Sequence, residues 1–183
     1  MQSYVLSIFT EDQIGLLHRI TTIFTRRNIN IESLTTSETE ISGIFRFIIV
    51  IRAVEADVEK LRKQIEKIIG VIKAFLLRKE DIVQQELALY KIAPDKLVNG
   101  TLEHLIRENH IRVLAYEQDY VMIEKTGHPG ETIELFRKLE PYGVLGFSRS
   151  GVIAISKKPL NVRSYLDPAD LAELESRTRS KAE

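Results

Sequence analysis

The residues best suited to chemistry lie in one short turn near the start of the chain, Glu11-Asp12-Gln13-Ile14-Gly15-Leu16-Leu17. If a helix begins here, its first backbone N–H groups lack partners and carry a partial positive charge, so they can hold a carboxylate or phosphate. Gly15 has no Cβ and lets a ligand approach the backbone closely. Asp12 is placed to receive an ammonium group beside that anion site. The turn therefore predicts a site for a zwitterionic amino acid, with the alternative that Asp12 only caps the helix and Gly15 only makes the turn.

A second candidate is the run Asn30-Ile31-Glu32-Ser33-Leu34-Thr35, which opens the next predicted strand. The side chain of Asn30 offers both a donor and an acceptor. Within one chain it lies far from Gly15, at the other end of the intervening helix. Two chains related by a two-fold axis can bring Asn30 of one near Gly15 of the other. The alternative is that Asn30 is a turn residue with an unusual backbone conformation.

The rest of the composition excludes several classes of site. The chain has no cysteine, which rules out disulfides, thiol catalysis and cysteine-based metal sites. Its four histidines show no metal-ligand spacing, and we find no phosphate loop, nucleophile elbow or catalytic carboxylate pair. The sequence therefore predicts neither a catalytic residue nor a metal site.

Charge and hydropathy limit the partners and the compartment. Lys and Arg number 26, as do Asp and Glu, so the chain lacks the basic field that nucleic acid requires. No apolar run reaches the roughly 18–20 residues that a membrane-spanning helix needs. The first residues lack a basic region and a cleavage site, so we expect a cytoplasmic protein.

Turn residues and hydrophobic periodicity predict the elements that carry the two candidate segments. The first 78 residues read as a βαββαβ unit, because short β-rich runs alternate with amphipathic helical patterns. Gly70 stands where a glycine ends the second helix. The predicted strands cover residues 3–9, 30–38, 44–51 and 71–78, and the helices cover 16–27 and 54–68.

The same order recurs about 80 residues later. Strands are predicted over 85–92, 111–116, 120–124, 144–148 and 151–156, with one helix after Pro94 and another after Pro129 that presents Ile133, Phe136 and Leu139 on its apolar face. The fold class is therefore α+β, with two ferredoxin-like βαββαβ units. The sheet face without helices presents residues such as Phe9 and Ile48, and we expect another domain or another copy to cover it. A polar tail begins at Pro159, with a helical turn or two expected over 168–175.

The two candidate segments together resemble a known family. The stretch TEDQIGLLHRITTIFTRRNINIESLTTSETE is similar to the N-terminal ACT domain of the small, regulatory subunit of acetolactate synthase (acetohydroxyacid synthase). The residues that carry the likeness are Gly15, Arg19, Phe24, Arg26 and the run Asn30-Ile31-Glu32-Ser33-Leu34. The segment from Arg149 to Ser156 resembles the family's C-terminal signature. The likeness covers residues 3–157 and implies an effector-binding ACT domain over 1–79, a C-terminal ferredoxin-like domain over 80–158 and a polar tail over 159–183.

The resemblance implies a regulatory, non-catalytic subunit in branched-chain amino acid biosynthesis. Members of the family bind a thiamine-diphosphate-dependent catalytic subunit, raise its activity and make it sensitive to a branched-chain amino acid, typically valine. Thiamine diphosphate, magnesium and FAD are expected only in that catalytic subunit, and none in this chain.

The resemblance also implies where the effector binds. It sits between the two ACT domains of a homodimer, and the matching positions here are Asp12, Gln13, Ile14, Gly15, Leu16, Leu17, Asn30 and Ile31. Better-known bacterial members often have asparagine where this chain has Asp12. Two other hypotheses stay open at this point: an ACT-domain amino-acid sensor that regulates a different enzyme or a transcription factor, and a chain that is itself an enzyme.

Overall fold

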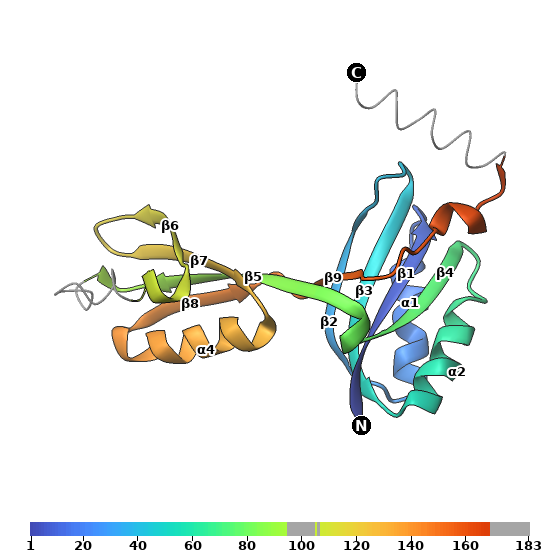
Figure 1. Ribbon diagram of the computed structural model, residues 1–183, viewed down its shortest axis with the longest axis horizontal. Coiled ribbons are helices and arrows are strands. Elements are labelled where there is room, and N and C mark those ends of the chain that lie inside the picture. The colour runs from blue at the N-terminus through green and yellow to red at the C-terminus, as the bar shows by residue number, and fades with distance from the viewer. Residues whose placement is uncertain (95–104, 106, 169–183) are drawn as a thin grey trace, which may run out of the picture. The chain divides into compact units, whose positions relative to one another are not determined.

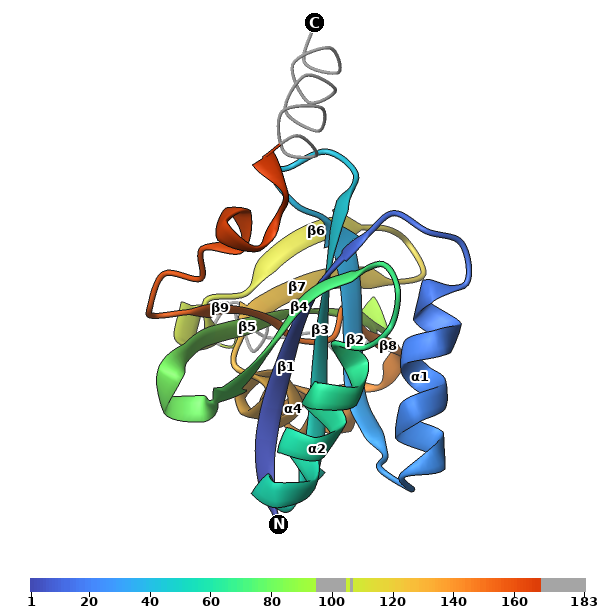
Figure 2. The same ribbon diagram turned by 90° about the vertical axis from the view of Figure 1, so that its right-hand side faces the viewer.

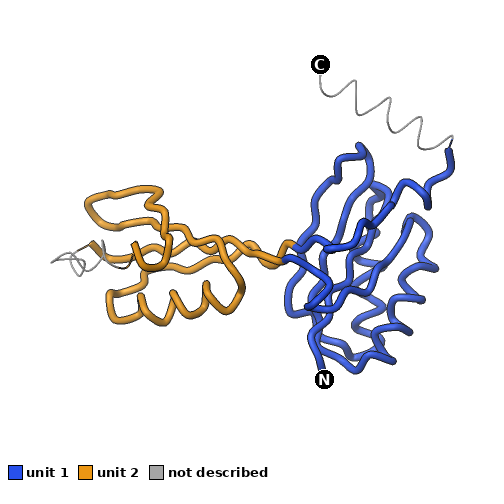
Figure 3. The backbone as a smooth tube through the Cα atoms, viewed as in Figure 1, with its two compact units in different colours: residues 1–83, 154–183 blue, residues 84–153 orange. Residues whose placement is uncertain are grey.

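The computed structural model describes residues 1–94, 105 and 107–168 of the chain, and these residues form two compact units. One unit comprises residues 1–83 together with 154–168, and the other comprises 84–153 (Figure 3). Each is described by itself below. The predicted domain limits at 79/80 and 158/159 remain a prediction, because the compact units follow packing in space and not order along the chain.

The first unit is a four-stranded antiparallel sheet with two helices (Figure 1). The strand order is β2-β3-β1-β4, and β1 and β2 both run antiparallel to β3, so they are parallel to each other. Figure 2 shows both helices on the same face of this sheet. The predicted ferredoxin-like α+β fold is thereby confirmed. The bounds are β1 (Gln2–Glu11), α1 (Leu16–Arg26), β2 (Ile31–Glu38), β3 (Ile44–Ala53), α2 (Glu55–Ile65) and β4 (Val71–Arg78).

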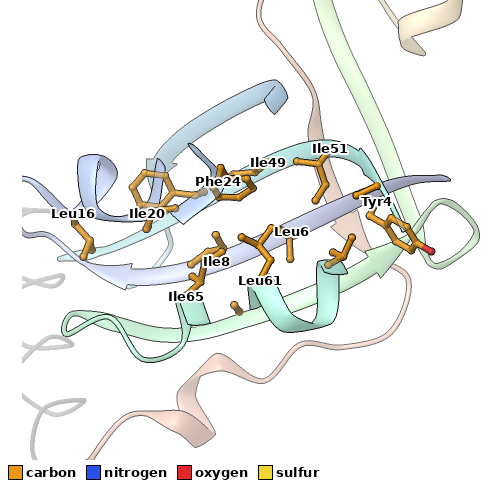
Figure 4. Close-up of a cluster of buried hydrophobic side chains, with 14 residues drawn as sticks. Tyr4, Leu6, Ile8, Leu16, Ile20, Phe24, Ile49, Ile51, Leu61 and Ile65 are labelled. Carbon is orange, nitrogen blue, oxygen red and sulfur yellow. The ribbon is translucent and has the colours of Figure 1, made fainter. Parts of the chain in front are cut away.

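The core of this unit lies between the sheet and the two helices. Alternate residues of a strand point to the same face, and residues three or four apart share one side of a helix, so apolar residues at these spacings meet in a single layer. Full burial of each such side chain contributes roughly 1.5–3 kcal/mol. The fully buried side chains that Figure 4 labels in this core are Tyr4, Leu6, Ile8, Leu16, Ile20, Phe24, Ile49, Ile51, Leu61 and Ile65.

The two helices of the first unit end differently. Helix α1 ends at Arg26, one residue before the predicted end, and Asn28, with φ of +54°, follows in the turn. Helix α2 ends at Ile65, three residues before the predicted end, because the chain then tightens into turns in which the N–H of Ile68 bonds to the carbonyl of Ile65. Gly70, at φ of +92°, therefore belongs to the turn that leads into β4 and does not directly follow the helix.

The sheet face opposite the helices is partly covered by the chain's own C-terminal segment, drawn in red in Figure 1. Val162, in a 3-10 turn η4 (Val162–Tyr165), packs in a buried cluster with Phe9 and Ile44. Upstream, Lys157 donates from its backbone N–H to the carbonyl of Asp81 at 2.8 Å. The sequence predicts another domain or copy over Phe9; that prediction is wrong for this residue, because Val162, from the chain's own C-terminal segment, packs against it.

The second unit repeats the strand order of the first. Its strand order is β6-β7-β5-β8, and β9 pairs with β5. After the 3-10 turn η1 (Lys79–Asp81), which occupies part of the predicted linker, the elements are β5 (Ile82–Ile92), β6 (Arg112–Tyr116), β7 (Val121–Gly127), α4 (Pro129–Leu139), η3 (Glu140–Tyr142) and β8 (Val144–Arg149). Strand β9 (Ile153–Ser156) begins at the last residue of this unit and continues into the first. The helix predicted after Pro94 and the turn predicted over 168–175 lie largely or wholly outside the described residues.

Helix α4 is rotated relative to the prediction. Its buried residues are Thr132, Leu135 and Leu139, whereas Ile133 and Phe136 are only half-buried. Thr132 is drawn toward the sheet because its backbone carbonyl accepts a hydrogen bond from the Tyr90 hydroxyl at 2.7 Å. A search of the described helices finds none that is long and apolar enough to span a membrane.

Candidate functional site

The glycine loop, which we define as residues 11–15, joins β1 to α1. Gly15 is the N-cap residue of α1, in the left-handed region with φ of +82° and ψ of −2°. No side chain caps the helix, and its first turn contains no acidic residue. The alternative in which Asp12 acts as the helix cap is therefore wrong. The first N–H groups of α1 therefore bond to no capping side chain, and no carboxylate of the first helical turn lies beside them.

The residues around this helix start are unusually open to solvent. Asp12, Gln13 and Gly15 are exposed, and the apolar side chains of Ile14 and Leu17 are 104% and 42% exposed. Leu16 differs, because it is buried and packs in the core. A Cβ placed on Gly15 would meet no atom within 4 Å, so open space lies directly over the backbone.

Backbone hydrogen bonds hold both ends of the glycine loop. The N–H of Glu11 donates to the carbonyl of Gly70 at 2.9 Å, and the N–H of Asp12 donates to the carbonyl of Gly43 at 2.9 Å. At the helix end, the N–H of Leu16 donates to the carbonyl of Gln13 at 3.2 Å. The loop is thus exposed on its outer side and anchored to two neighbouring turns on its inner side.

The predicted residues at the second segment lie at the far end of α1. Asn30 is exposed just before β2, and Ile31 is partly buried against the core. The helix between Gly15 and Asn30 has eleven residues, which corresponds to about 16 Å at 1.5 Å per residue. A single chain therefore does not bring Gly15 and Asn30 together.

Asn30 lines an open recess that the sequence analysis did not identify. Three arginines share this recess: Arg26, Arg27 and Arg52. The Nε of Arg27 donates to Gln64 Oε1 at 2.6 Å, which ties the end of α1 to α2. Arg26 and Arg27 lie at the end of α1 and Arg52 on β3, so no spacing in the sequence indicates that Arg52 meets the other two.

A buried polar cluster in the second unit is structural. Glu86 is 2% exposed and accepts hydrogen bonds from the Thr132 hydroxyl and from Arg149 Nη1, the latter at 3.2 Å. Burial, followed by the charge of Glu86, raises the pKa of the Tyr90 hydroxyl, which donates to a backbone carbonyl. The hydrogen bonds of Glu86 join β5 to α4 and to β8. Within residues 1–94, 105 and 107–168, no set of three or more acidic or histidine side chains is grouped to hold a metal ion.

Comparison with known proteins identifies both units. Residues 6–73 match the acetohydroxyacid synthase small subunit-like ACT domain, and residues 85–158 match the family described as the small subunit of acetolactate synthase. The chain is 33% identical over 160 residues to the acetolactate synthase small subunit of Mycolicibacterium smegmatis, covering 87% of this chain and 94% of that protein. It is 32% identical over 154 residues to the Bacillus subtilis protein of the same name, covering 84% of this chain and 90% of that one.

A solved structure has the same fold. The crystal structure of the acetolactate synthase small subunit from Thermotoga maritima superposes with a TM-score of 0.80 at 23% identity, covering 87% of this chain and all of that one. The resemblance seen in the glycine loop and in the run that begins at Asn30 thus extends over both units. The chain belongs to the family of acetolactate synthase small subunits.

Proposed function

We propose that this chain is the regulatory, non-catalytic subunit of an acetolactate synthase. It binds the thiamine-diphosphate-dependent catalytic subunit, raises its activity and confers feedback inhibition by valine or a related branched-chain amino acid. Membership of the small-subunit family supports the partner. The geometry of the glycine loop supports the effector site. In this proposal, catalysis takes place in the other subunit.

The observation that carries the effector site is the uncapped start of α1. An exposed glycine precedes helix N–H groups that no side chain caps, and such a helix start attracts a carboxylate. Asp12 supplies a negative charge on the same loop for an ammonium group. Ile14 and Leu17 add exposed apolar surface, which suits a branched aliphatic side chain. A small zwitterion with an apolar side chain therefore matches the three kinds of group present.

The second half of the proposed site comes from a second copy of the chain. β2 lies at the edge of its sheet, so its outer side is placed for antiparallel pairing with the β2 of a twin. α1 runs opposite to β2, so Gly15 is level with the end of β2 while Asn30 is at its start. A two-fold axis that reverses β2 brings the twin's start of β2 level with Gly15. Asn30 and Ile31 of one protomer would then face the glycine loop of the other.

A reconstitution assay tests the proposal. Acetolactate formation by the cognate catalytic subunit is measured with increasing amounts of this chain, and then with valine, leucine and isoleucine titrated in turn. We expect stimulation by the chain and inhibition by at least one of the amino acids. The variant Asn30→Ala should weaken inhibition while stimulation persists, whereas Asn161→Ala, an exposed asparagine in the C-terminal segment, should leave both unchanged.

Three other results would each contradict the proposal in a different way. Amino-acid binding without any stimulation of the catalytic subunit would favour a sensor for another enzyme or for a transcription factor. Turnover of pyruvate by the isolated chain would make it an enzyme. Equal loss of stimulation and inhibition in Asn30→Ala would show that effector binding and activation do not use separate surfaces.

A further inference from the structure

One arginine connects the glycine loop to a turn far away in the sequence. Arg19, on the first part of α1, donates from Nη1 to the carbonyl of Ile69 at 3.1 Å and from Nη2 to Gln13 Oε1 at 3.1 Å. Ile69 is separated from Arg19 by 50 positions and lies in the turn between α2 and β4. The same guanidinium thus holds the loop with one nitrogen and the turn with the other.

The side chain of Gln13 is fixed from a second direction. Its Nε2 donates to Glu11 Oε2 at 2.5 Å while its Oε1 accepts from Arg19. Gly70 lies directly against it, since a Cβ on Gly70 would come within 2.8 Å of Gln13 Oε1. The backbone carbonyl of Gly70 also accepts the N–H of Glu11. The turn at 69–70 therefore supports the glycine loop through both backbone and side-chain contacts.

We infer that Arg19 is a positioning residue of the effector site, and that it sets the place of the uncapped α1 amides by clamping Gln13 to the 69–70 turn. This inference rests on the proposed function for the identity of the ligand, but the clamp itself is a property of the free chain. Gln13 is then a support for the loop through its side chain and does not itself contact the effector. The sequence singles out Arg19 only through family resemblance and gives no sign of its partner at Ile69.

The planar fork of the guanidinium makes the inference testable with a charge-preserving change. A guanidinium can hold two acceptors in fixed directions, whereas the lysine ammonium is a compact charge on a flexible stem. Arg19→Lys therefore keeps the charge and removes the clamp. Gly70→Ala disturbs the same clamp from the other side, because its Cβ would come within 2.8 Å of Gln13 Oε1 and because φ of +92° strains an alanine in the turn. Arg78→Lys is the matched control, since Arg78 bonds to Glu55 at the end of β4 away from the glycine loop.

Two measurements on the full-length chain separate the clamp from the ligand. Hydrogen exchange of the amides of Glu11, Asp12 and Leu16, which are hydrogen-bonded in the free chain, should accelerate by about 5-fold or more in Arg19→Lys and in Gly70→Ala, but not in Arg78→Lys, when it is measured without any amino acid. Calorimetric titration with valine should show about 5- to 10-fold weaker binding in the first two variants, as expected for loss of about one hydrogen bond. Thermal unfolding identifies any variant that is no longer folded.

The possible results separate a clamp from direct contact between Arg19 and the effector. Unchanged exchange in a folded Arg19→Lys chain overturns the inference. Weaker valine binding in Arg19→Lys with wild-type binding in Gly70→Ala also overturns it, because it would mean that Arg19 contacts the effector directly. Faster exchange in the variants, together with a wild-type chain that binds no branched-chain amino acid, leaves the clamp supported and contradicts the proposed function.

Discussion

If the carboxylate of the effector lies against the start of α1, a negative charge added at Gly15 should weaken binding, and the pair Gly15→Asp and Gly15→Asn tests this. Gly15 has φ of +82°, and a Cβ there enters open space, so neither variant creates a clash with the described residues. Both residues adopt the left-handed conformation at a similar cost, on the order of 1 kcal/mol. The two side chains have nearly the same shape and differ in a full negative charge. The comparison therefore isolates the electrostatics of the site.

The size of the difference follows from Coulomb's law. Two unit charges 4 Å apart repel by about 1 kcal/mol in water and about 4 kcal/mol at an effective dielectric constant of 20. The Asp variant should therefore bind valine about 5- to 1000-fold more weakly than the Asn variant. The loop is exposed, so we expect the lower part of this range. The difference should shrink in about 1 M salt, where the Debye length falls to roughly 3 Å.

The assay is calorimetric titration of each variant with valine at low and high salt, with thermal unfolding measured in parallel. Both variants should unfold about 2–4 °C below the wild type, because they share the same backbone strain. Equal affinity for valine in two folded variants would refute the idea that an effector carboxylate lies against the start of α1. A difference that does not respond to salt would refute its electrostatic origin.

Three further predictions concern stability. Truncation after Lys158 uncovers the sheet face under the C-terminal segment and should lower the free energy of unfolding of the first unit by about 2–4 kcal/mol in urea titrations; an unchanged midpoint would contradict this packing. Burial alone would raise the pKa of Glu66, but the hydrogen bond from Lys73 and neighbouring positive charge outweigh it and hold the pKa below its ordinary value. A carboxyl group whose pKa is lowered on folding stabilises the fold at pH values above its unfolded-state pKa, and this stabilisation is lost as the pH falls through its folded-state pKa. Glu66→Gln should therefore cost about 1 kcal/mol of stability at pH 7 and nothing in acid. A cost that is the same at both pH values would refute this prediction. Arg149→Ala leaves Glu86 buried without its cation and should destabilise the second unit by about 3 kcal/mol, and the double variant with Glu86→Gln should regain part of that loss if the charge is the cause.

The alternation of apolar residues was sufficient to predict most of the fold. Strand β4 has the bounds predicted from Val71 to Arg78, and α1 differs by one residue at its end. Such patterns are local, because a strand or helix that lies on a core must repeat its apolar residues every two or every 3.6 positions. The rotation of α4 was not predicted, because Thr132 reads as polar until Tyr90 and Glu86 are placed beneath it.

The candidate site, like the fold, was predicted only in part. The glycine loop was found from its residues, since a glycine at the start of an apolar helical pattern has a specific backbone meaning. Arg19 was visible, but its contact with Ile69 was not, because two turns 50 positions apart meet only after the sheet has formed. The cover over Phe9 was missed because residues after 158 are too polar on average to indicate that Val162 is buried.

The sequence by itself determined the order of the elements, the family and the two segments proposed to bind an amino acid, because each depends on neighbouring residues and their spacing. Only the tertiary structure decided that Gly15 and not Asp12 is the N-cap residue of α1, that Gln13 is held by Arg19 beside the turn at Gly70, and that the C-terminal segment partly covers one face of the first sheet. These features depend on which distant backbone groups come within hydrogen-bonding distance, and that is set by how the strands and helices pack.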